Sequence, residues 1–395
     1  MGNEAPRGTI PRAGEILADK YEVGEPLGAG GMGVVVAARN VDLRKDVAIK
    51  LLHPELLGDA EAVARFLREA RLMAALQSEH VTRVYDVGRL PGGAPYMVME
   101  LLHGTDLHKV ARRGALSIEV AIDIILQAGE AVAEAHAQGI IHRDLKPANL
   151  FLATRVAGST LIKVMDFGIS KMIAARRGGL EFTLDGGLTA PATLMGTPHF
   201  ISPEQIVGAH AVDHRTDIWA LGAILHRLIA GSVPFEAEDS IGCLHRVMSD
   251  QPTPLRERCP AAPPALEAIV LRCLEKDVDQ RMPSVAALAE ALAPFAAVRS
   301  LPSVDRIRKM SGASSEPEEG PRSTARPAGP RTLLLVPEPL EPITPFRVPG
   351  PSAPTRRGST SAGLRWGPTP SPPSQPPSGS GTAGLRLPPK KPDPI

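Results

Sequence analysis

The sequence predicts an α+β protein with a small antiparallel β lobe, a larger and mostly helical lobe, and a disordered C-terminal tail. Three observations lead to this prediction. Apolar and β-branched residues form short strand-like runs over 21–52, and apolar residues recur every three or four positions from 117 to about 297. In addition, 22 of the 40 prolines fall within residues 301–395. The folded part of the chain is therefore expected to end near residue 297.

The charge of the chain divides at the same place as its proline content. Residues 301–395 carry 13 lysines and arginines against 7 acidic residues, a net charge of +6. Residues 1–300 carry 31 against 36, a net charge of −5. The overall charge of +1 therefore averages two different polymers, which we interpret separately.

Composition excludes several classes of protein. No run approaches the roughly 20 consecutive apolar residues that a membrane helix needs, and residues 1–10 lack the basic-then-apolar pattern of a secretory signal. The three cysteines are too few and too widely spaced for a disulfide framework or a zinc ribbon. We expect no membrane segment and a cytoplasmic location, where thiols stay reduced.

Residues 21–102 have the pattern of the small β lobe. Strands are expected over 21–28, 33–40 and 44–52, and again over 81–88 and 95–102, because β-branched residues cluster there between turn residues. Residues 60–76 instead have helical spacing, with apolar side chains at Val63, Phe66, Leu67, Ala70 and Met73. An antiparallel meander with one main helix is the simplest assembly.

The helical lobe is expected over 103–297, and the flanking segments lie outside both lobes. A long helix is predicted over 117–138, with Ser117 as its N-cap and Gly139 as the residue that ends it. Short strands and loops follow over 140–170, then mostly helices. Residues 1–20 form an N-terminal extension. Residues 298–395, rich in Pro, Ser, Gly and Arg, have too few large apolar side chains to offset their conformational entropy.

A glycine-rich turn carries the first chemical signal. Gly28, Gly30 and Gly33 form a Gly-x-Gly-x-x-Gly pattern. In dinucleotide-binding folds such glycines precede a helix, whereas here a predicted strand follows. Glycines at a turn between strands let backbone amides approach a polyphosphate. An ordinary glycine hairpin fits the same residues, so this motif does not decide the function alone.

A lysine in an apolar strand is the second signal. Lys50 lies seventeen residues after Gly33, between Ile49 and Leu51. Such a cation can neutralise phosphate oxygens, and an anionic partner would orient it. Glu69, on the same predicted helix face as Phe66, is the candidate partner. Two ordinary surface charges are the alternative, although a surface lysine is less expected among apolar neighbours.

Two polar motifs follow at the start of the helical lobe. Residues 142–149 read His-Arg-Asp-Leu-Lys-Pro-Ala-Asn, and residues 166–168 read Asp-Phe-Gly. Together they offer a carboxylate for a hydroxyl proton, a cation for a phosphate in transfer, and an amide and a carboxylate as oxygen ligands. Few, hard oxygen ligands suit Mg²⁺ bound to a nucleotide.

In this order and spacing, the motifs resemble those of the eukaryotic-type protein kinases. The lysine two residues after the aspartate resembles the Ser/Thr branch, and Gly-Gly-Met-Gly resembles the bacterial (Hanks-type) members. The resemblance covers about residues 21–297. It implies a bilobal protein-kinase fold, with the N-lobe at 21–102 and the C-lobe at 103–297.

The resemblance implies a Ser/Thr protein kinase that transfers the γ-phosphate of ATP to hydroxyls of proteins, its own activation loop included. Asp144 would accept the proton of the substrate hydroxyl, and Lys146 would steady the γ-phosphate. Asn149 and Asp166 would hold Mg²⁺, for which Mn²⁺ is a possible substitute.

The resemblance also implies an ATP site beneath the glycine turn. Val35 and Ala48 would form its apolar roof, Met99 its back, and Phe151 its floor, where the family more often has Leu, Ile or Met. The residues implied to line the site are Leu27, Gly28, Ala29, Gly30, Gly31, Met32, Gly33, Val35, Ala48, Lys50, Glu69, Met99, Glu100, Leu102 and Phe151. Backbone groups of Glu100 and Leu102 would bond the base.

An arginine before the catalytic aspartate, here Arg143, often marks control by phosphorylation of the activation loop in this family. Thr189 and Thr193 are the candidate phosphosites, because a phosphothreonine would offset the local cation and order the loop. Thr197 resembles instead the threonine that bonds the catalytic Asp and Lys.

Three further residues have implied structural roles. Glu204, in Ser-Pro-Glu, would pair with Arg281 and tie the activation segment to the helical lobe. Asp217 resembles the buried aspartate that holds the backbone of the catalytic loop.

Two other classes of function compete with an active kinase. A pseudokinase or scaffold that recruits partners through the tail would have degraded catalytic motifs. In this chain the catalytic motifs are intact. A small-molecule phosphotransferase would lack the Gly-Thr-Pro and Ser-Pro-Glu segment, which this chain has. Protein substrates are expected partners, and a partner that binds Pro-rich motifs is possible for the tail. The nucleic-acid signal is weak, and the sequence leaves the oligomeric state open.

Overall fold

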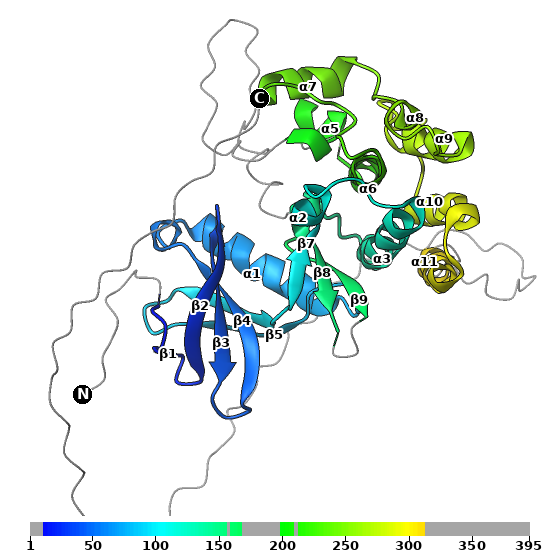
Figure 1. Cartoon of the computed structure of the whole chain (residues 1–395). Helices are drawn as coiled ribbons and strands as arrows, with labels where there is room; N and C mark the ends of the chain where they lie inside the picture. The colour runs from blue at the N-terminus through cyan, green and yellow to red at the C-terminus, as the bar shows by residue number, and fades with distance from the viewer. Residues whose placement is uncertain (1–10, 156–158, 168–197, 209–211, 313–395) are drawn as a thin grey trace, which may run out of the picture. The chain divides into compact units, whose positions relative to one another are not determined.

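A six-stranded antiparallel sheet forms the N-terminal lobe of the protein (Figure 1). The computed structural model describes residues 11–155, 159–167, 198–208 and 212–312. The strand order is β1-β2-β3-β4-β6-β5. The strands are β1 (Ile16–Leu17), β2 (Tyr21–Gly30), β3 (Gly33–Asn40), β4 (Lys45–Leu52), β5 (Val84–Arg89) and β6 (Pro95–Glu100).

The sheet has its own apolar core because alternate residues of its strands face the same side. Val34, Val36 and Ala38 of β3 are buried with Val23 of β2 and Val98 of β6. β3 pairs with β4 over its whole length, which places Val35 opposite Lys50. This register places Lys50 of β4 beside the end of β3 at which the glycine turn joins β3 to β2.

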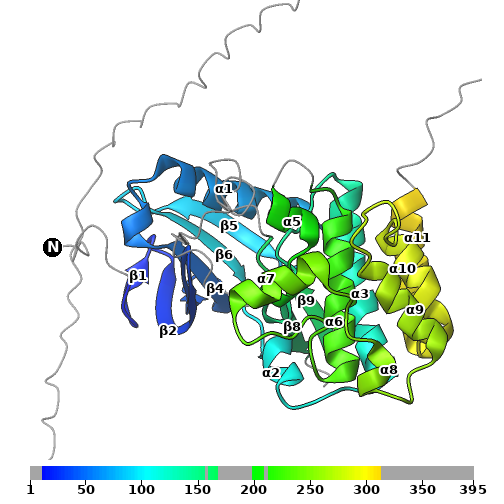
Figure 2. The ribbon, with the colours of Figure 1, turned by 90° about the horizontal axis from the view of Figure 1, so that it is seen from above.

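One helix, α1 (Ala60–Ala75), packs against β5 and β6 (Figure 2). The Asp59 carboxylate caps it by accepting hydrogen bonds from the backbone N–H groups of Glu61 and Ala62, at 2.9 and 3.2 Å. Its buried face includes Phe66, Glu69 and Met73, which follow helical spacing. The face that packs against the sheet therefore carries a carboxylate among apolar side chains.

The C-terminal lobe is built around two long helices, α3 (Ile118–Ala137) and α6 (Arg215–Ala230). Ser117 caps α3, and Gly139 follows its end at a φ of +71°, a conformation that suits glycine. Around them lie shorter helices: α2 (Leu107–Ala111), α5 (Pro203–Val207), α7 (Ser240–Ser249), α8 (Leu255–Arg258), α9 (Pro264–Cys273), α10 (Val285–Leu292) and α11 (Leu301–Gly312). Buried residues of α3 and α6 supply much of its apolar core.

A small antiparallel sheet lies where the two lobes meet. It has the order β7 (Gly104–Asp106), β8 (Leu150–Thr154) and β9 (Thr160–Val164). β9 is joined to the N-lobe by backbone hydrogen bonds, because the Val164 N–H donates to His80 O and the Thr82 N–H donates to Val164 O, at 2.7 and 3.1 Å. The segment after β9 therefore has a fixed position relative to α1.

The structure confirms the predicted fold class, and it differs from the prediction at both edges of the folded region. β1 lies within the predicted N-terminal extension and pairs with β2. The expected tail, 298–395, begins with a helix: Val304 and Ile307 of α11 are buried, three residues apart on one face. A high proline content obscured this short apolar pattern. Residues 313–395 lie outside the described part of the chain.

Candidate active site

The glycine turn joins β2 and β3 and is exposed at its tip. Leu27 and the residues from Gly28 to Gly31 are exposed, whereas Gly33 is buried. A Cβ at Gly33 would lie 1.9 Å from Leu51 O, so only glycine allows β3 to approach β4 here. His53 holds the turn through two contacts. Its ring Nε2 lies 2.9 Å from Gly30 O, and its backbone N–H donates to Met32 O at 3.0 Å.

Lys50 joins two carboxylates that come from different parts of the chain. Its Nζ lies 2.7 Å from Glu69 Oε1 on α1 and 2.7 Å from Asp166 Oδ1 after β9. Burial works against the ammonium, but Asp166 and Glu69 outweigh it and raise the pKa of Lys50. Burial raises the pKa of Glu69, and Lys50 opposes that rise. With two carboxylates in contact with it, the Lys50 side chain stays charged.

The catalytic-loop residues converge around Asp144. Lys146 Nζ lies 2.9 Å from Asp144 Oδ2, and Asn149 Nδ2 donates to Asp144 O at 2.8 Å and to Oδ2 at 3.2 Å. Arg143 has a φ of +64°, and Asp166 has a φ of +50°. Such left-handed conformations are strained for these residue types and persist only where surrounding contacts enforce them.

Buried polar contacts supply that enforcement. Asp217 accepts hydrogen bonds from the backbone N–H groups of His142 and Arg143, at 2.9 and 2.8 Å, and lies 2.8 Å from His136 Nε2. Burial alone would raise the pKa of Asp217, but the contact with His136 and the backbone N–H bond lower it. Asp217 is thus a buried anion that holds the backbone on the N-terminal side of the strained Arg143.

His142 connects the catalytic loop to the segment that carries Asp166. Its Nε2 donates to Met165 O at 3.0 Å, its Nδ1 accepts from the Asp144 N–H at 3.3 Å, and its ring packs on Phe167. Burial lowers the pKa of His142. The neutral ring is the form that this pattern needs, because one ring nitrogen must accept a hydrogen bond.

The apolar residues implied for the base lie on both lobes. Ala48 and Met99 are buried and face each other across β4 and β6, and Val35 lies on β3. Phe151 lies on β8 of the small sheet. The Glu100 carboxylate accepts from the Arg83 N–H at 2.7 Å and contacts Lys163 Nζ at 2.5 Å. The Glu100 backbone N–H donates to Arg83 O at 2.9 Å, so this donor is already used within the N-lobe.

The ion pair expected to anchor the activation segment is present. Arg281 donates to both carboxylate oxygens of Glu204, at 2.7 and 3.0 Å, and also to Arg215 O and Glu275 O. Both side chains are almost fully buried, at 0 and 6 % exposure. Bidentate geometry and filled donors are what make a buried pair tolerable. Thr189, Thr193, Thr197 and Gly168 lie outside the described residues.

Three contacts of the site were missed from the sequence. His53 holds the glycine turn, His136 contacts Asp217, and Gln205 donates to the carbonyl of Arg143 at 2.8 Å. Gln205 follows Glu204 directly, but no local pattern indicates that it reaches a residue 62 positions away. Each of these contacts forms within one lobe, between segments that are distant in the sequence and that meet only when the lobe folds.

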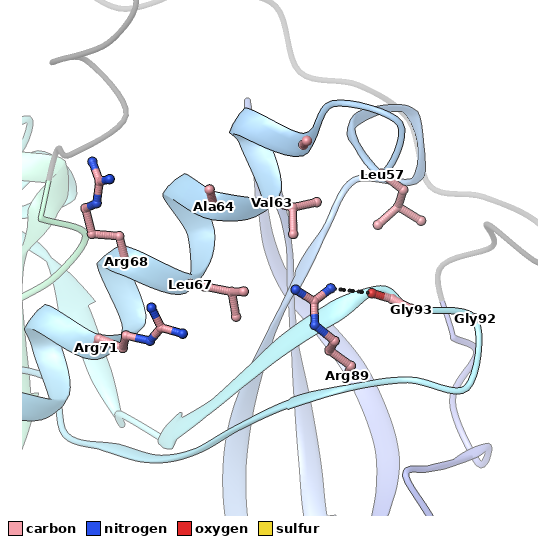
Figure 3. A pocket seen from close by; sticks show the side chains of 10 residues that line it. Leu57, Val63, Ala64, Leu67, Arg68, Arg71, Arg89, Gly92 and Gly93 are labelled. Atoms are coloured by element: carbon pink, nitrogen blue, oxygen red, sulfur yellow. Dashed lines mark hydrogen bonds between the residues drawn. The ribbon is translucent and has the colours of Figure 1, made fainter. Parts of the chain in front are cut away.

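A separate pocket of about 600 Å³ lies between α1 and the turn that joins β5 to β6 (Figure 3). Leu57, Val63 and Leu67 line its apolar side, and Arg68, Arg71 and Arg89 line its basic side. Arg89 Nη1 donates to Gly93 O at 3.0 Å across the turn. None of the residues implied for the ATP site lines this pocket, so it is not the nucleotide cleft.

Hard oxygen ligands are available beside Lys50 and Asp144. Because Asn149 Nδ2 is used by Asp144, the amide oxygen is the atom left to face another group. The Asp166 side chain is 54 % exposed, and one of its two oxygens contacts Lys50. Within the described residues, no three His, Cys, Asp or Glu side chains form a metal cluster. A carboxylate and an amide fit an ion that completes its shell with phosphate oxygens and water.

Comparisons with known proteins agree with this geometry. A family model described as protein kinase domain matches residues 21–292. Serine/threonine-protein kinase pkn3 of Myxococcus xanthus is 38 % identical over 283 residues, which cover 71 % of this chain and 50 % of that protein. PknB of Mycolicibacterium smegmatis is 37 % identical over 274 residues, 68 % of this chain and 42 % of that protein. The chain thus spans about half the length of the curated relatives it matches.

Solved structures show the same fold. The crystal structure of a doubly substituted kinase domain of Mycobacterium tuberculosis PknI matches with a TM-score of 0.55 and 25 % identity, covering 72 % of this chain and 99 % of that one. The family expected from the sequence motifs is therefore confirmed. The chain belongs to the protein kinase family and is related to bacterial Hanks-type serine/threonine kinases.

Proposed function

We propose that this protein is an active Ser/Thr protein kinase that transfers the γ-phosphate of ATP to protein hydroxyls. The observation that carries the proposal is the contact of Lys50 with both Glu69 and Asp166, next to a catalytic loop in which Asp144, Lys146 and Asn149 converge. Phosphoryl transfer needs mainly positioned charges and polar groups, and this arrangement supplies them from six residues in four separate segments of the chain.

The transfer step assigns a task to each of these side chains. The substrate hydroxyl oxygen forms a bond to the γ-phosphorus, the bond from that phosphorus to the β–γ bridging oxygen breaks, and ADP leaves. Asp144 orients the hydroxyl and accepts its proton. Lys146, 2.9 Å from Asp144 in this structure, neutralises charge on the γ-phosphate. Lys50, held by Glu69, neutralises the α- and β-phosphates.

Asn149 and Asp166 are the residues that would hold Mg²⁺, or Mn²⁺ in its place. A divalent ion at this position supplies charge neutralisation on the phosphate oxygens. Asp166 contacts Lys50 directly, so the residues that hold the phosphates and the residue that holds the metal ion are linked. The strained backbone at Asp166 supports its placement as a functional residue.

Control through the activation loop is a further part of the proposal. Arg143 precedes the catalytic aspartate and occupies the strained position that Asp217 and Gln205 hold. We expect autophosphorylation at Thr189, Thr193 or both, with Thr197 contacting Asp144 and Lys146. Mass spectrometry of protein incubated with Mg-ATP tests this, and an unmodified 180–197 peptide from active enzyme would refute it.

Protein substrates are the expected partners, and the Pro-rich tail is the expected docking segment for a further partner. Cys243, Cys259 and Cys273 are free thiols, which supports a reducing, cytoplasmic location. Among the helices of the described ranges, none has the length and apolar character needed to cross a bilayer.

Labelled ATP tests the proposed activity in one step. The full chain is incubated with Mg²⁺, labelled ATP and a generic basic protein, and in parallel without the protein substrate. Label on serine and threonine, absent with Asp144→Asn, is the expected result. ATP binding without transfer would establish the pseudokinase alternative, and label only on small molecules would establish the phosphotransferase alternative.

A further inference from the structure

The chain continues beyond the matched family model, which ends at residue 292, into a helix that is part of the core. α11 lies beside α3 and α10 in both views (Figures 1 and 2). Val304 and Ile307 are buried, and a Cβ added to Gly129 of α3 would lie 3.2 Å from Ile307 Cδ1. α11 is therefore fitted closely against α3.

A row of polar side chains on α3 faces the same region. Asp123, Gln127, Glu130 and Glu134 follow one another at spacings of four, three and four residues, which places them on one helix face. We name these four residues the polar stripe. Asp123 accepts from Ser300 Oγ at 2.6 Å, just before α11. Buried polar side chains need hydrogen-bond partners. For Asp123 this partner is Ser300, in the C-terminal segment.

Arg306 of α11 is the main partner of the stripe. Its Nε and Nη2 donate to the two carboxylate oxygens of Glu130, at 2.5 and 2.7 Å. The Glu130 side chain is only 5 % exposed. Burial would raise the pKa of Glu130, but contacts with His80, Arg306 and Ser303 lower it to about 2. Glu130 is thus a buried anion whose charge is balanced from outside the matched domain.

On its other side, the stripe contacts the segment between α1 and β5, residues 76–83, and the strand β9. His80 Nε2 lies 3.5 Å from Glu130 Oε1, and His80 Nδ1 donates to Ile162 O at 2.9 Å. The Ile162 N–H donates to Gln127 Oε1 at 2.9 Å. Glu130 therefore links α11 to the segment 76–83, and β9 is joined to this group through His80 and Gln127.

The next residue of the stripe strengthens this attachment. Glu134 accepts hydrogen bonds from the backbone N–H groups of Gln77 and Ser78, each at 2.7 Å. Residues 76–83 follow directly after α1, the helix that carries Glu69. They also bond to Val164 of β9, two residues before Asp166. The segment 76–83 thus connects α1, which carries Glu69, to β9, which is followed by Asp166. Glu69 and Asp166 are the two carboxylates that contact Lys50.

We propose that α11 is part of the catalytic unit and that Arg306 is a positioning residue for phosphoryl transfer. By balancing the charge of Glu130, Arg306 fixes the segment 76–83 and β9, and through them the positions of Glu69 and Asp166. Removal of Arg306 leaves the buried Glu130 carboxylate without its cation. The polar stripe then becomes more exposed to water, and its contacts with 76–83 and β9 weaken. Arg306 touches neither substrate nor phosphate.

The test compares two substitutions on the same helix in the full-length chain. Arg306→Met keeps an unbranched apolar stem and a similar helix propensity but removes the cation. Arg308→Met is the matched control, because Arg308 is exposed and its ion pair, among the residues that the structure describes, is with Asp305 of its own helix. We expect kcat to fall roughly 2- to 30-fold in Arg306→Met, the range seen for residues that modulate a distant site, and to stay unchanged in Arg308→Met.

Hydrogen exchange provides a readout that does not depend on transfer. This proposal rests on the proposed kinase function for its kcat readout only. In Arg306→Met, amides of residues 76–83 should exchange faster while those of α6 stay protected. Unchanged exchange at 76–83, or an equal acceleration throughout the domain, would overturn the proposal whether or not the chain transfers phosphate.

A rescue experiment separates positioning from a general loss of stability. Adding Glu130→Gln to Arg306→Met removes the uncompensated charge, so the double variant should regain both kcat and the protection of 76–83 relative to Arg306→Met. If the losses of the two single variants simply multiply, Arg306 and Glu130 act independently and the proposed route is wrong.

Discussion

Lys50 and Asp166 are separated by 116 residues in the sequence, yet Lys50 Nζ lies 2.7 Å from Asp166 Oδ1. The same nitrogen lies 2.7 Å from Glu69 Oε1. One cation therefore joins the central sheet of the N-lobe, the helix α1 and the segment after β9. The position of α1 and the position of the proposed metal ligand cannot change independently without breaking one of these contacts.

Substitution of Lys50 should therefore affect both activity and stability. Lys50→Met is expected to lower phosphoryl transfer by about 10²- to 10³-fold, because a charge aimed at the phosphates is lost. It should also lower the free energy of unfolding by about 3–5 kcal/mol, because Glu69 keeps a buried charge without its cation. Urea unfolding and labelled-ATP assays measure the two effects. Lys50→Met with Glu69→Gln should regain stability but not activity, and recovery of both would contradict the assigned role.

Asp144→Asn should remove activity without affecting the fold. Asparagine keeps the shape of the side chain but does not accept a proton, so transfer should fall by about 10²- to 10⁴-fold, the usual contribution of a general base. The thermal midpoint should stay within a few degrees of wild type. Phosphorylation at a near-wild-type rate would refute Asp144 as the base.

Two glycines of the same turn should respond differently to alanine. At Gly33 a Cβ would lie 1.9 Å from Leu51 O, so Gly33→Ala must push β3 away from β4. We expect a loss of about 1–3 kcal/mol in the free energy of unfolding and a raised KM for ATP. At Gly31 a Cβ meets nothing within 4 Å, so Gly31→Ala should change stability by less than about 0.5 kcal/mol. Equal urea midpoints for the two variants would show that β3 can move away from β4 without a loss of stability, which would contradict this prediction.

The buried pair Glu204–Arg281 should contribute far more to stability than an exposed pair in the same lobe. Arg281→Met leaves a buried Glu204 carboxylate and should cost about 3–5 kcal/mol. The control is Arg246→Met, because Arg246 and Asp250 are 3.9 Å apart and about half exposed, where a cost of at most about 1 kcal/mol is expected. Similar urea midpoints for the two variants would contradict the importance of the buried pair.

Acid should destabilise the protein partly through Glu130. The pKa of Glu130 falls from an ordinary 4.5 to about 2 in the folded state. Its contribution to stability is therefore complete above pH 4.5 and disappears as the pH falls toward 2. The urea midpoint of the wild type should drop more between pH 5 and pH 3 than that of Glu130→Gln. A parallel drop in both proteins would show that Glu130 has no such role.

Local patterns in the sequence were sufficient to predict most elements. The alternation over 33–40 and the helical spacing over 60–76 match β3 and α1 closely, and Ser117 and Gly139 mark the ends of α3 as expected. These predictions succeed because caps, turns and apolar periodicity act over a few residues. α11 was missed, because its buried residues Val304 and Ile307 are few and lie where proline becomes frequent.

The sequence alone determined the lobes, the family and the identity of the polar residues at the site, because glycine spacing and short polar motifs are local properties. The tertiary structure decided which of these residues meet. It placed His53 on the glycine turn, Gln205 on the carbonyl of Arg143, and Arg306 on Glu130 of α3. Such contacts arise only when packing of the apolar cores brings distant segments together, and each buried polar group then takes whichever partner lies within reach.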